Sequence, residues 1–83
     1  MTSISLTTRS KLSPEKIFVR AETTFGDEYG LELTSQTEDT IHFEGGGGFV
    51  EIKAVQNGHL TDVDLSGREW TFELERFLQS IAF

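Results

Sequence analysis

The chain has 83 residues, the size of one small domain, which leaves little room for an internal ligand cavity of several hundred Å³. Asp and Glu outnumber Lys and Arg by 14 to 7, and the net charge of −7 argues against binding to nucleic-acid phosphates. The absence of cysteine excludes disulfides, thiolate metal sites and cysteine nucleophiles. We find no apolar run of membrane-spanning length and no secretory signal pattern, so we expect a single domain over residues 1–83 in the cytoplasm.

The N-terminal part of the chain predicts a strand followed by a helix. Residues 4–8 alternate between apolar and polar side chains, as a half-buried strand does. Ser13 is a favourable N-cap and Pro14 is tolerated at the first helical position, so a helix should begin there. We expect it to end between Gly26 and Gly30. Its apolar stripe consists of Ile17, Phe18, Ala21, Phe25 and Tyr29.

The chain from residue 31 onward predicts four antiparallel strands joined by short loops. Residues 31–35 form the first of them, residues 36–39 form a polar loop, and three more strands follow within residues 40–65. Alternation along each strand gives the sheet one apolar face. That face should carry Leu31, Leu33, Ile41, Phe43, Val50, Ile52, Ala54, Val63 and Leu65.

Two turn signals determine the expected pairing of these strands. Asn57 and Gly58 favour a type I′ turn, because both residues accept a positive φ at low cost. With these two residues at the turn, Ile52 lies opposite Val63. The run of four glycines predicts the preceding hairpin, in which Ile41 lies opposite Ile52. A slip by one residue would move every apolar side chain to the wrong face, so the pattern specifies the facing of the strands.

The end of the chain predicts a second helix. Ser66 and Glu69 match a capping box, in which the two side chains satisfy free backbone N–H groups at a helix start. The order β-α-β-β-β-β-α then indicates an α+β two-layer sandwich, with an antiparallel sheet and both helices on its apolar face. The apolar side of the last helix should consist of Trp70, Leu74, Phe77, Leu78 and Ile81.

His42 is the main candidate for chemistry on the outward face of the sheet. The expected register places it in one row with Glu51 and Asp64. A histidine beside carboxylates could bind a divalent metal or act as a general base. The row would lie on an open surface with no wall to exclude water, and a solvated sheet face has the same composition. We therefore favour the solvated face and expect no cofactor.

Neither the glycine run nor the serines indicate catalysis. A phosphate-binding loop normally opens a helix and carries Lys with Ser or Thr, whereas Gly45–Gly48 leads into the alternating Phe-Val-Glu-Ile-Lys. The glycines therefore predict a hairpin loop, or a place where another backbone or a ligand approaches closely. No serine lies in a Gly-x-Ser-x-Gly elbow. The sequence gives no positive indication of an enzyme.

The order of elements resembles two protein families. Lys-Leu-Ser-Pro-Glu-Lys-Ile-Phe at 11–18 opens a helix after a strand, and Gly-Arg-Glu-Trp at 67–70 opens the last helix. This order resembles a shortened START-like (helix-grip, polyketide-cyclase-type) domain, in which the space between the sheet and a C-terminal helix binds apolar ligands. It is also similar to the small polyhydroxyalkanoic-acid-system proteins, which are associated with storage granules. The first resemblance implies a ligand site lined by Trp70, Phe77, Phe43 and Ile52.

Apolar side chains without an expected place in the core indicate an interaction surface. If they form one contiguous patch, they would mark an interface. We hypothesise a non-catalytic binding domain that acts through self-association as a homodimer or through a protein partner. The alternative is a reduced helix-grip domain that binds a small apolar ligand between the last helix and the sheet. The candidate interface residues are Phe49, Phe72, Val55 and Leu60.

Overall fold

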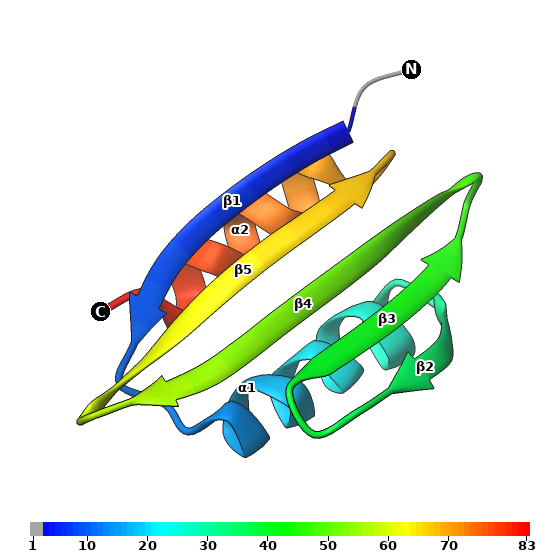
Figure 1. Ribbon diagram of the computed structural model, residues 1–83. Coiled ribbons are helices and arrows are strands. Elements are labelled where there is room, and N and C mark those ends of the chain that lie inside the picture. Colours follow the sequence, from blue (N-terminus) through cyan, green and yellow to red (C-terminus); the bar gives the residue numbers. More distant parts are fainter. Residues whose placement is uncertain (1–2) are drawn as a thin grey trace.

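The computed structural model describes residues 3–83 and has an α+β fold with one five-stranded antiparallel sheet. The strand order is β1-β5-β4-β3-β2, so β1 and β2 are the two edges (Figure 1). All helical segments lie on one face of the sheet (Figure 1), which confirms the predicted fold class. The strands are β1 (Ser3–Ser10), β2 (Glu32–Gln36), β3 (Thr40–Gly45), β4 (Gly48–Asn57) and β5 (Leu60–Arg68). The helical segments are α1 (Pro14–Ala21), η1 (Glu22–Glu28) and α2 (Thr71–Ile81).

The core lies between the sheet and the helices. α2 packs across β1 and β5, and α1 packs against β4. Of the residues expected on the apolar face of the sheet, all are buried except Leu33, which is 42% exposed. Leu33 was expected to face the core, and its exposure follows from its place on the edge strand β2, whose pairing with β3 is irregular between Leu33 and Ser35.

The first helix begins where the sequence predicts and becomes wider toward its end. The Ser13 hydroxyl accepts a hydrogen bond from the Lys16 backbone N–H at 3.3 Å, as expected of an N-cap. The π-helical segment η1 continues α1 without a break, and Gly30 follows with a φ of 74°. Apolar residues four apart drift by about 40° per repeat on an ideal α-helix. The wider turns of η1 compensate for this drift and keep Phe25 and Tyr29 against the core.

The hairpin between β3 and β4 has the predicted register, with Ile41 opposite Ile52. Its turn consists of Gly46 and Gly47, whose φ values are 59° and 82°. A type I′ turn requires a positive φ at both central residues. The glycine run therefore forms the hairpin loop that the sequence predicts.

The hairpin between β4 and β5 has a different turn from the predicted one. Gly58 and His59 are its central residues, one position later along the chain. Gly58 has a φ of 67° and His59 has no positive φ, which is the pattern of a type II′ turn. Val63 consequently pairs with Ala54 and not with Ile52. The pairing is shifted by two residues, so each side chain keeps its predicted face although its neighbours change.

The predicted capping box at the start of the last helix is wrong. Ser66 lies inside β5, where it pairs with Ser5 of β1 and Glu51 of β4. A strand with a neighbour on each side satisfies its backbone N–H and C=O groups more completely than the first turn of a helix does. The chain leaves β5 through Glu69, whose φ of 72° is rare for a residue other than glycine. Trp70 is the N-cap of α2.

Two glycines allow β4 and β5 to lie close together at this end of the sheet. A Cβ atom on Gly48 would overlap the carbonyl oxygen of Arg68. A Cβ atom on Gly67 would lie 2.6 Å from both the Phe49 carbonyl oxygen and the Leu74 Cδ1 atom. Real Cβ atoms do not make such contacts, so both positions need glycine. The close approach that the glycine run suggests is thus made in part by β5 of the same chain.

Candidate functional site

The space between α2 and the sheet is filled by side chains of the protein. Phe43, Ile52 and Phe77, three of the four predicted ligand-binding residues, are at most 3% exposed. The Phe25 ring lies among them, with its centroid 6.0 Å from that of Phe43 and 5.4 Å from that of Phe77. An apolar ligand at this place would have to displace the Phe25 ring.

Trp70, the fourth predicted ligand-binding residue, closes one end of this core. Its indole N–H donates a hydrogen bond of 2.8 Å to the carbonyl oxygen of Gly45. Its ring lies against the β3–β4 turn, where a Cβ atom on Gly46 would come within 2.8 Å of the indole. The centroid of the Tyr29 ring lies 5.9 Å from that of the Trp70 ring. These contacts assign Trp70 a structural role that joins α2 to the hairpin.

His42 forms a cross-strand cluster with two carboxylates on the outer face of the sheet. Its Nδ1 atom is 3.1 Å from Oε1 of Glu51, and its Nε2 atom is 3.2 Å from Oε2 of Glu44. Both ring nitrogens thus have a carboxylate oxygen within hydrogen-bonding distance. The ring also stacks on Phe49 at a centroid distance of 5.5 Å. His42 is therefore satisfied by its own neighbours.

The predicted row of His42, Glu51 and Asp64 is only partly assembled, because Asp64 lies elsewhere. Glu51 pairs with Ser66, while Asp64 pairs with Lys53, because the β4–β5 register is shifted by two residues. Within residues 3–83, no group of three His, Cys, Asp or Glu side chains has an arrangement that could hold a metal ion. The structure thus keeps His42 beside Glu51, as predicted, and separates Asp64 from both.

The four predicted interface residues do not form one patch. Phe49 is half-buried beside His42 on the outer face, whereas Phe72 lies on α2, on the opposite side of the sheet, and is 63% exposed. Leu60 is half-buried at the start of β5, opposite Asn57 rather than Val55. Phe49 lines a small hollow on the outer face with His42 and Arg68, and Val55 lines a separate concave part of the surface.

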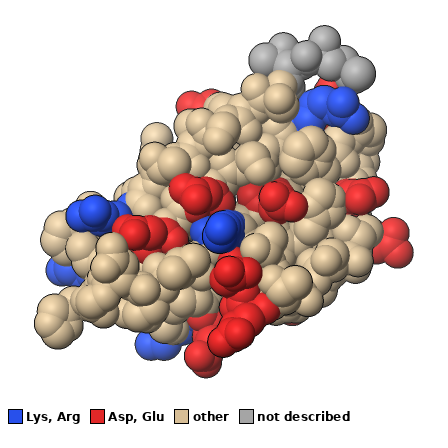
Figure 2. Space-filling view, in the orientation of Figure 1, with Lys and Arg blue, Asp and Glu red and all other residues tan. Residues whose placement is uncertain are grey.

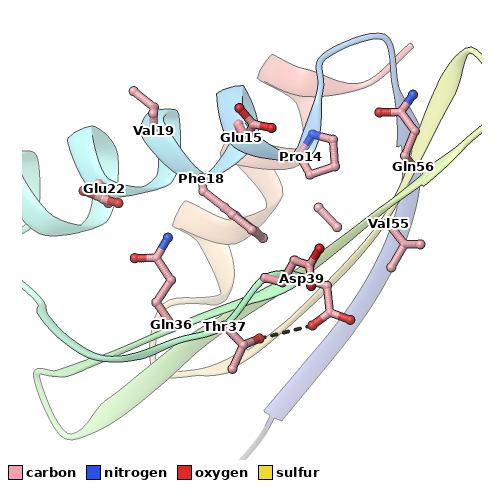
Figure 3. A pocket seen from close by; sticks show the side chains of 12 residues that line it. Pro14, Glu15, Phe18, Val19, Glu22, Gln36, Thr37, Asp39, Val55 and Gln56 are labelled. Atoms are coloured by element: carbon pink, nitrogen blue, oxygen red, sulfur yellow. Dashed lines mark hydrogen bonds between the residues drawn. The ribbon is translucent and has the colours of Figure 1, made fainter.

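That concave part is an open hollow between α1 and the sheet, next to the turn that joins β2 to β3 (Figure 3). Its volume is about 870 Å³, and we call it the acidic groove. Phe18 points from α1 toward the turn and, with Ala54 of β4, forms a buried apolar floor (Figure 3). The groove is lined by Pro14, Glu15, Phe18, Val19, Glu22, Gln36, Thr37, Glu38, Asp39, Ala54, Val55 and Gln56.

Carboxylates stand on both sides of the acidic groove. Glu15 and Glu22 come from the first helix, and Glu38 and Asp39 come from the β2–β3 turn. Among the described residues, none of the four takes part in an ion pair, and no Lys, Arg or His lines the groove. Figure 2 shows acidic side chains gathered around the β2–β3 turn. The groove therefore has a negative potential that the protein leaves uncompensated.

Two exposed valines lie at the rim of the groove, Val19 on α1 and Val55 on the outer face of the sheet, and both side chains point away from the floor (Figure 3). Val19 on α1 is 63% exposed, and Val55 on β4 is 43% exposed. The wall formed by the β2–β3 turn is held firmly, because Oδ1 of Asp39 accepts 3.1 Å hydrogen bonds from the hydroxyls of Thr37 and Thr40. The backbone N–H of Ala54 also donates to the Asp39 carbonyl at 2.9 Å. The groove thus offers apolar contact area between preformed acidic walls.

The sequence contained only part of the information needed to find this groove. Glu15, Val19 and Glu22 recur at helical spacing and indicate one face of the first helix. The facing wall depends on the β2–β3 turn, which the sequence predicts only as a polar loop. No protein-family model and no curated protein matches the chain. Within residues 3–83, the structure contains no helix that is long and apolar enough to cross a membrane.

Proposed function

We propose that this chain is a non-catalytic binding domain whose acidic groove holds a segment of a partner protein. The segment would place an apolar side chain against the floor formed by Phe18 and Ala54 and direct Lys or Arg side chains to the carboxylates on either side. The observation that supports this proposal is the combination, in one concavity, of a buried apolar floor with four carboxylates that have no ion-pair partner.

The two kinds of contact would contribute differently to the complex. Exposed carboxylates attract a basic segment and select its charge, but each exposed ion pair contributes only about 0–1 kcal/mol. Most of the affinity would come from covering the apolar floor and the exposed Val19 beside it, because buried apolar area contributes about 25 cal/mol per Å². The binding should therefore be modest in strength and should weaken as salt screens the groove.

The test is a calorimetric titration with three synthetic peptides of equal length. The first alternates Lys and Leu, the second replaces each Leu by Ser, and the third replaces each Lys by Glu. We expect the first peptide alone to bind measurably, with an affinity that falls as salt concentration rises. Equal binding of the third peptide would contradict the role of the carboxylates, and equal binding of the second would contradict the role of the apolar floor.

A charge-matched pair of variants tests whether the peptide binds in the groove. The triple variant Glu15→Gln, Glu22→Gln and Glu38→Gln should lower the affinity for the Lys-Leu peptide by about tenfold or more, the equivalent of 1.4 kcal/mol. The control carries the same loss of charge at exposed carboxylates outside the groove and should keep most of the affinity. An equal loss in both variants would mean that only net charge matters, and the proposal would be wrong. The control positions are Glu28, Glu32 and Glu75.

A further inference from the structure

The two edges of the sheet differ in how well they are protected from pairing with another strand. β2 has only five residues, and its pairing is interrupted by an irregularity between Leu33 and Ser35. It also carries the charged Glu32. Short length, bulges and charged side chains are the usual devices that prevent edge-to-edge association. The β2 edge is therefore a poor template for a further strand.

The β1 edge is longer and regular, and it carries a single charged residue, which is already paired. Its eight residues pair with β5 without interruption, from Ser3 opposite Arg68 to Ser10 opposite Thr61. It contains no proline and no carboxylate. Its one charged residue, Arg9, is bound to Asp62 at 3.1 Å. An extended, regular and nearly neutral edge of this kind can accept another strand.

One hydrogen bond identifies the backbone groups that face outward from this edge. The carbonyl oxygen of Arg9 accepts a 2.7 Å hydrogen bond from the backbone N–H of Phe83 and so points away from β5. Residues of an antiparallel strand alternate in this respect, so the N–H and C=O groups of Ser3, Ser5 and Thr7 also point away from β5. The C-terminal residue thus occupies the Arg9 end of the edge and leaves Ser3 to Thr7 open.

We propose that the β1 edges of two copies of this chain pair antiparallel and form a symmetric dimer with a continuous ten-stranded sheet, five strands from each copy. Ser5 would lie opposite Ser5 of the second copy, and Ser3 opposite Thr7 of the second copy. All outward backbone groups of these residues then find partners, and Ile4 faces Leu6 of the second copy. A register centred on Leu6 would require the Arg9 carbonyl, which Phe83 already occupies.

Charge and apolar surface both favour a second copy as the occupant of this edge. Each copy has a net charge of −7, so two copies repel least where no carboxylate is present, as along β1. Ile4 and Leu6 of β1 and Leu78 of α2 pack against the core and remain partly exposed. A second copy would supply the same three apolar side chains to cover them. The paired segment is short, so the dimer should be weak and dependent on concentration.

Sedimentation equilibrium over the micromolar range tests this proposal with one matched pair of variants. Ser5→Lys places two like charges opposite each other at the symmetry axis and should weaken the dimer by at least about tenfold. Ser35→Lys makes the same change on the β2 edge and should leave the dimer intact. A chain that is monomeric throughout, or a dimer that Ser5→Lys does not weaken, would contradict the proposal.

Cysteine cross-linking tests the register, and it does not depend on the behaviour of the lysine variant. The chain has no cysteine, so a single introduced thiol is a specific reporter. Directly opposed residues in a hydrogen-bonded pair are about 5.5 Å apart at Cα, which fits a disulfide. Ser5→Cys should therefore form a covalent dimer under mild oxidation, whereas Thr7→Cys should not, because its two copies would lie about four residues apart along the strands. Cross-linking of Thr7→Cys, or of neither variant, would contradict the register.

The dimer proposal and the groove proposal can be tested separately, and either can be wrong without the other. The acidic groove is lined by residues of α1, the β2–β3 turn and β4, and none of its residues belongs to β1. The Glu15→Gln, Glu22→Gln and Glu38→Gln variant should therefore dimerise at least as well as the unchanged chain. Ser5→Lys should bind the Lys-Leu peptide with unchanged affinity per chain.

Discussion

The protein contains two helix-over-sheet spaces of opposite character. Beneath α2, aromatic side chains meet across the layer, with the Phe25 and Phe77 rings 5.4 Å apart, and the space is closed. Beside α1, the layer is open as the acidic groove of about 870 Å³. The difference follows from the size of the side chains: Phe43 occupies the sheet beneath η1, whereas Ala54 occupies it beneath α1. The same architecture thus gives a packed core at one place and an open concavity at another.

The largest expected effect comes from opening the closed space. Phe77→Ala removes a buried ring that contacts Phe25 and should lower the free energy of unfolding by about 3–5 kcal/mol. Urea denaturation followed by circular dichroism measures this change. Phe72→Ala, on the exposed side of the same helix, is the control and should change stability by less than about 0.5 kcal/mol. Similar losses in both variants would mean that the α2 layer is not packed as described.

A smaller loss of stability is expected when a methyl group is added to the closed space. Gly67→Ala would bring a methyl group against the Phe49 carbonyl and the Leu74 side chain, and overpacking of this kind costs about 1–3 kcal/mol. Gly26→Ala is the control, because its Cβ atom would have ordinary contact with Phe43 at 3.9 Å. In a helical segment this control should be neutral or slightly stabilising. In thermal unfolding, the midpoint temperature of Gly67→Ala should therefore fall clearly, whereas that of Gly26→Ala should stay the same or rise slightly.

Loss of the hydrogen bond at the end of the closed space should have a further, smaller effect. Trp70→Phe keeps an aromatic ring but leaves the Gly45 carbonyl without the indole N–H donor. We expect a loss of about 1–2 kcal/mol in the free energy of unfolding, a typical cost for a lost hydrogen bond together with part of a ring. Hydrogen exchange should show the loss locally, as faster exchange at the β3–β4 turn. Unchanged exchange there would show that Trp70 does not hold the turn.

The smallest effect on stability is expected in the open space. Val19→Ser changes an exposed side chain and should alter the free energy of unfolding by less than about 0.5 kcal/mol. The same variant should weaken binding of the Lys-Leu peptide, because it removes apolar area from one side of the groove. If Val19→Ser destabilised the fold strongly, α1 would pack more tightly than the structure shows. Stable folding with unchanged peptide affinity would remove Val19 from the binding surface.

The sequence predicted the fold class because its signals depend on local periodicity. Alternation placed Ile41 and Ile52 on the buried face, and this held even though the β4–β5 pairing is shifted by two residues. The turn itself was predicted incorrectly, because Gly58 can serve either as the second residue of a type I′ turn or as the first of a type II′ turn. The choice between them depends on tertiary pairing, which local sequence does not contain.

The candidate sites were harder to predict, for the same reason. The Ser66 and Glu69 pair resembles a capping box, but β1 and β4 pair with Ser66 on both sides and keep it in a strand. The row of His42 with Asp64 was lost through the register shift alone. The acidic groove requires α1 and the β2–β3 turn to face each other, and no local pattern in the chain encodes that arrangement.

We infer that the open space beside α1 binds a partner segment and that the closed space beneath α2 does not. A titration of the ¹⁵N-labelled protein with the Lys-Leu peptide, followed by two-dimensional NMR, tests it most directly. We predict that the largest shifts will occur at amides of the groove, among them Val19, Asp39 and Val55, with little change at Phe25 and Phe77. Shifts centred on Phe25 and Phe77 would contradict the claim and would indicate a ligand site beneath α2. Shifts spread evenly over the surface would show that no specific site exists.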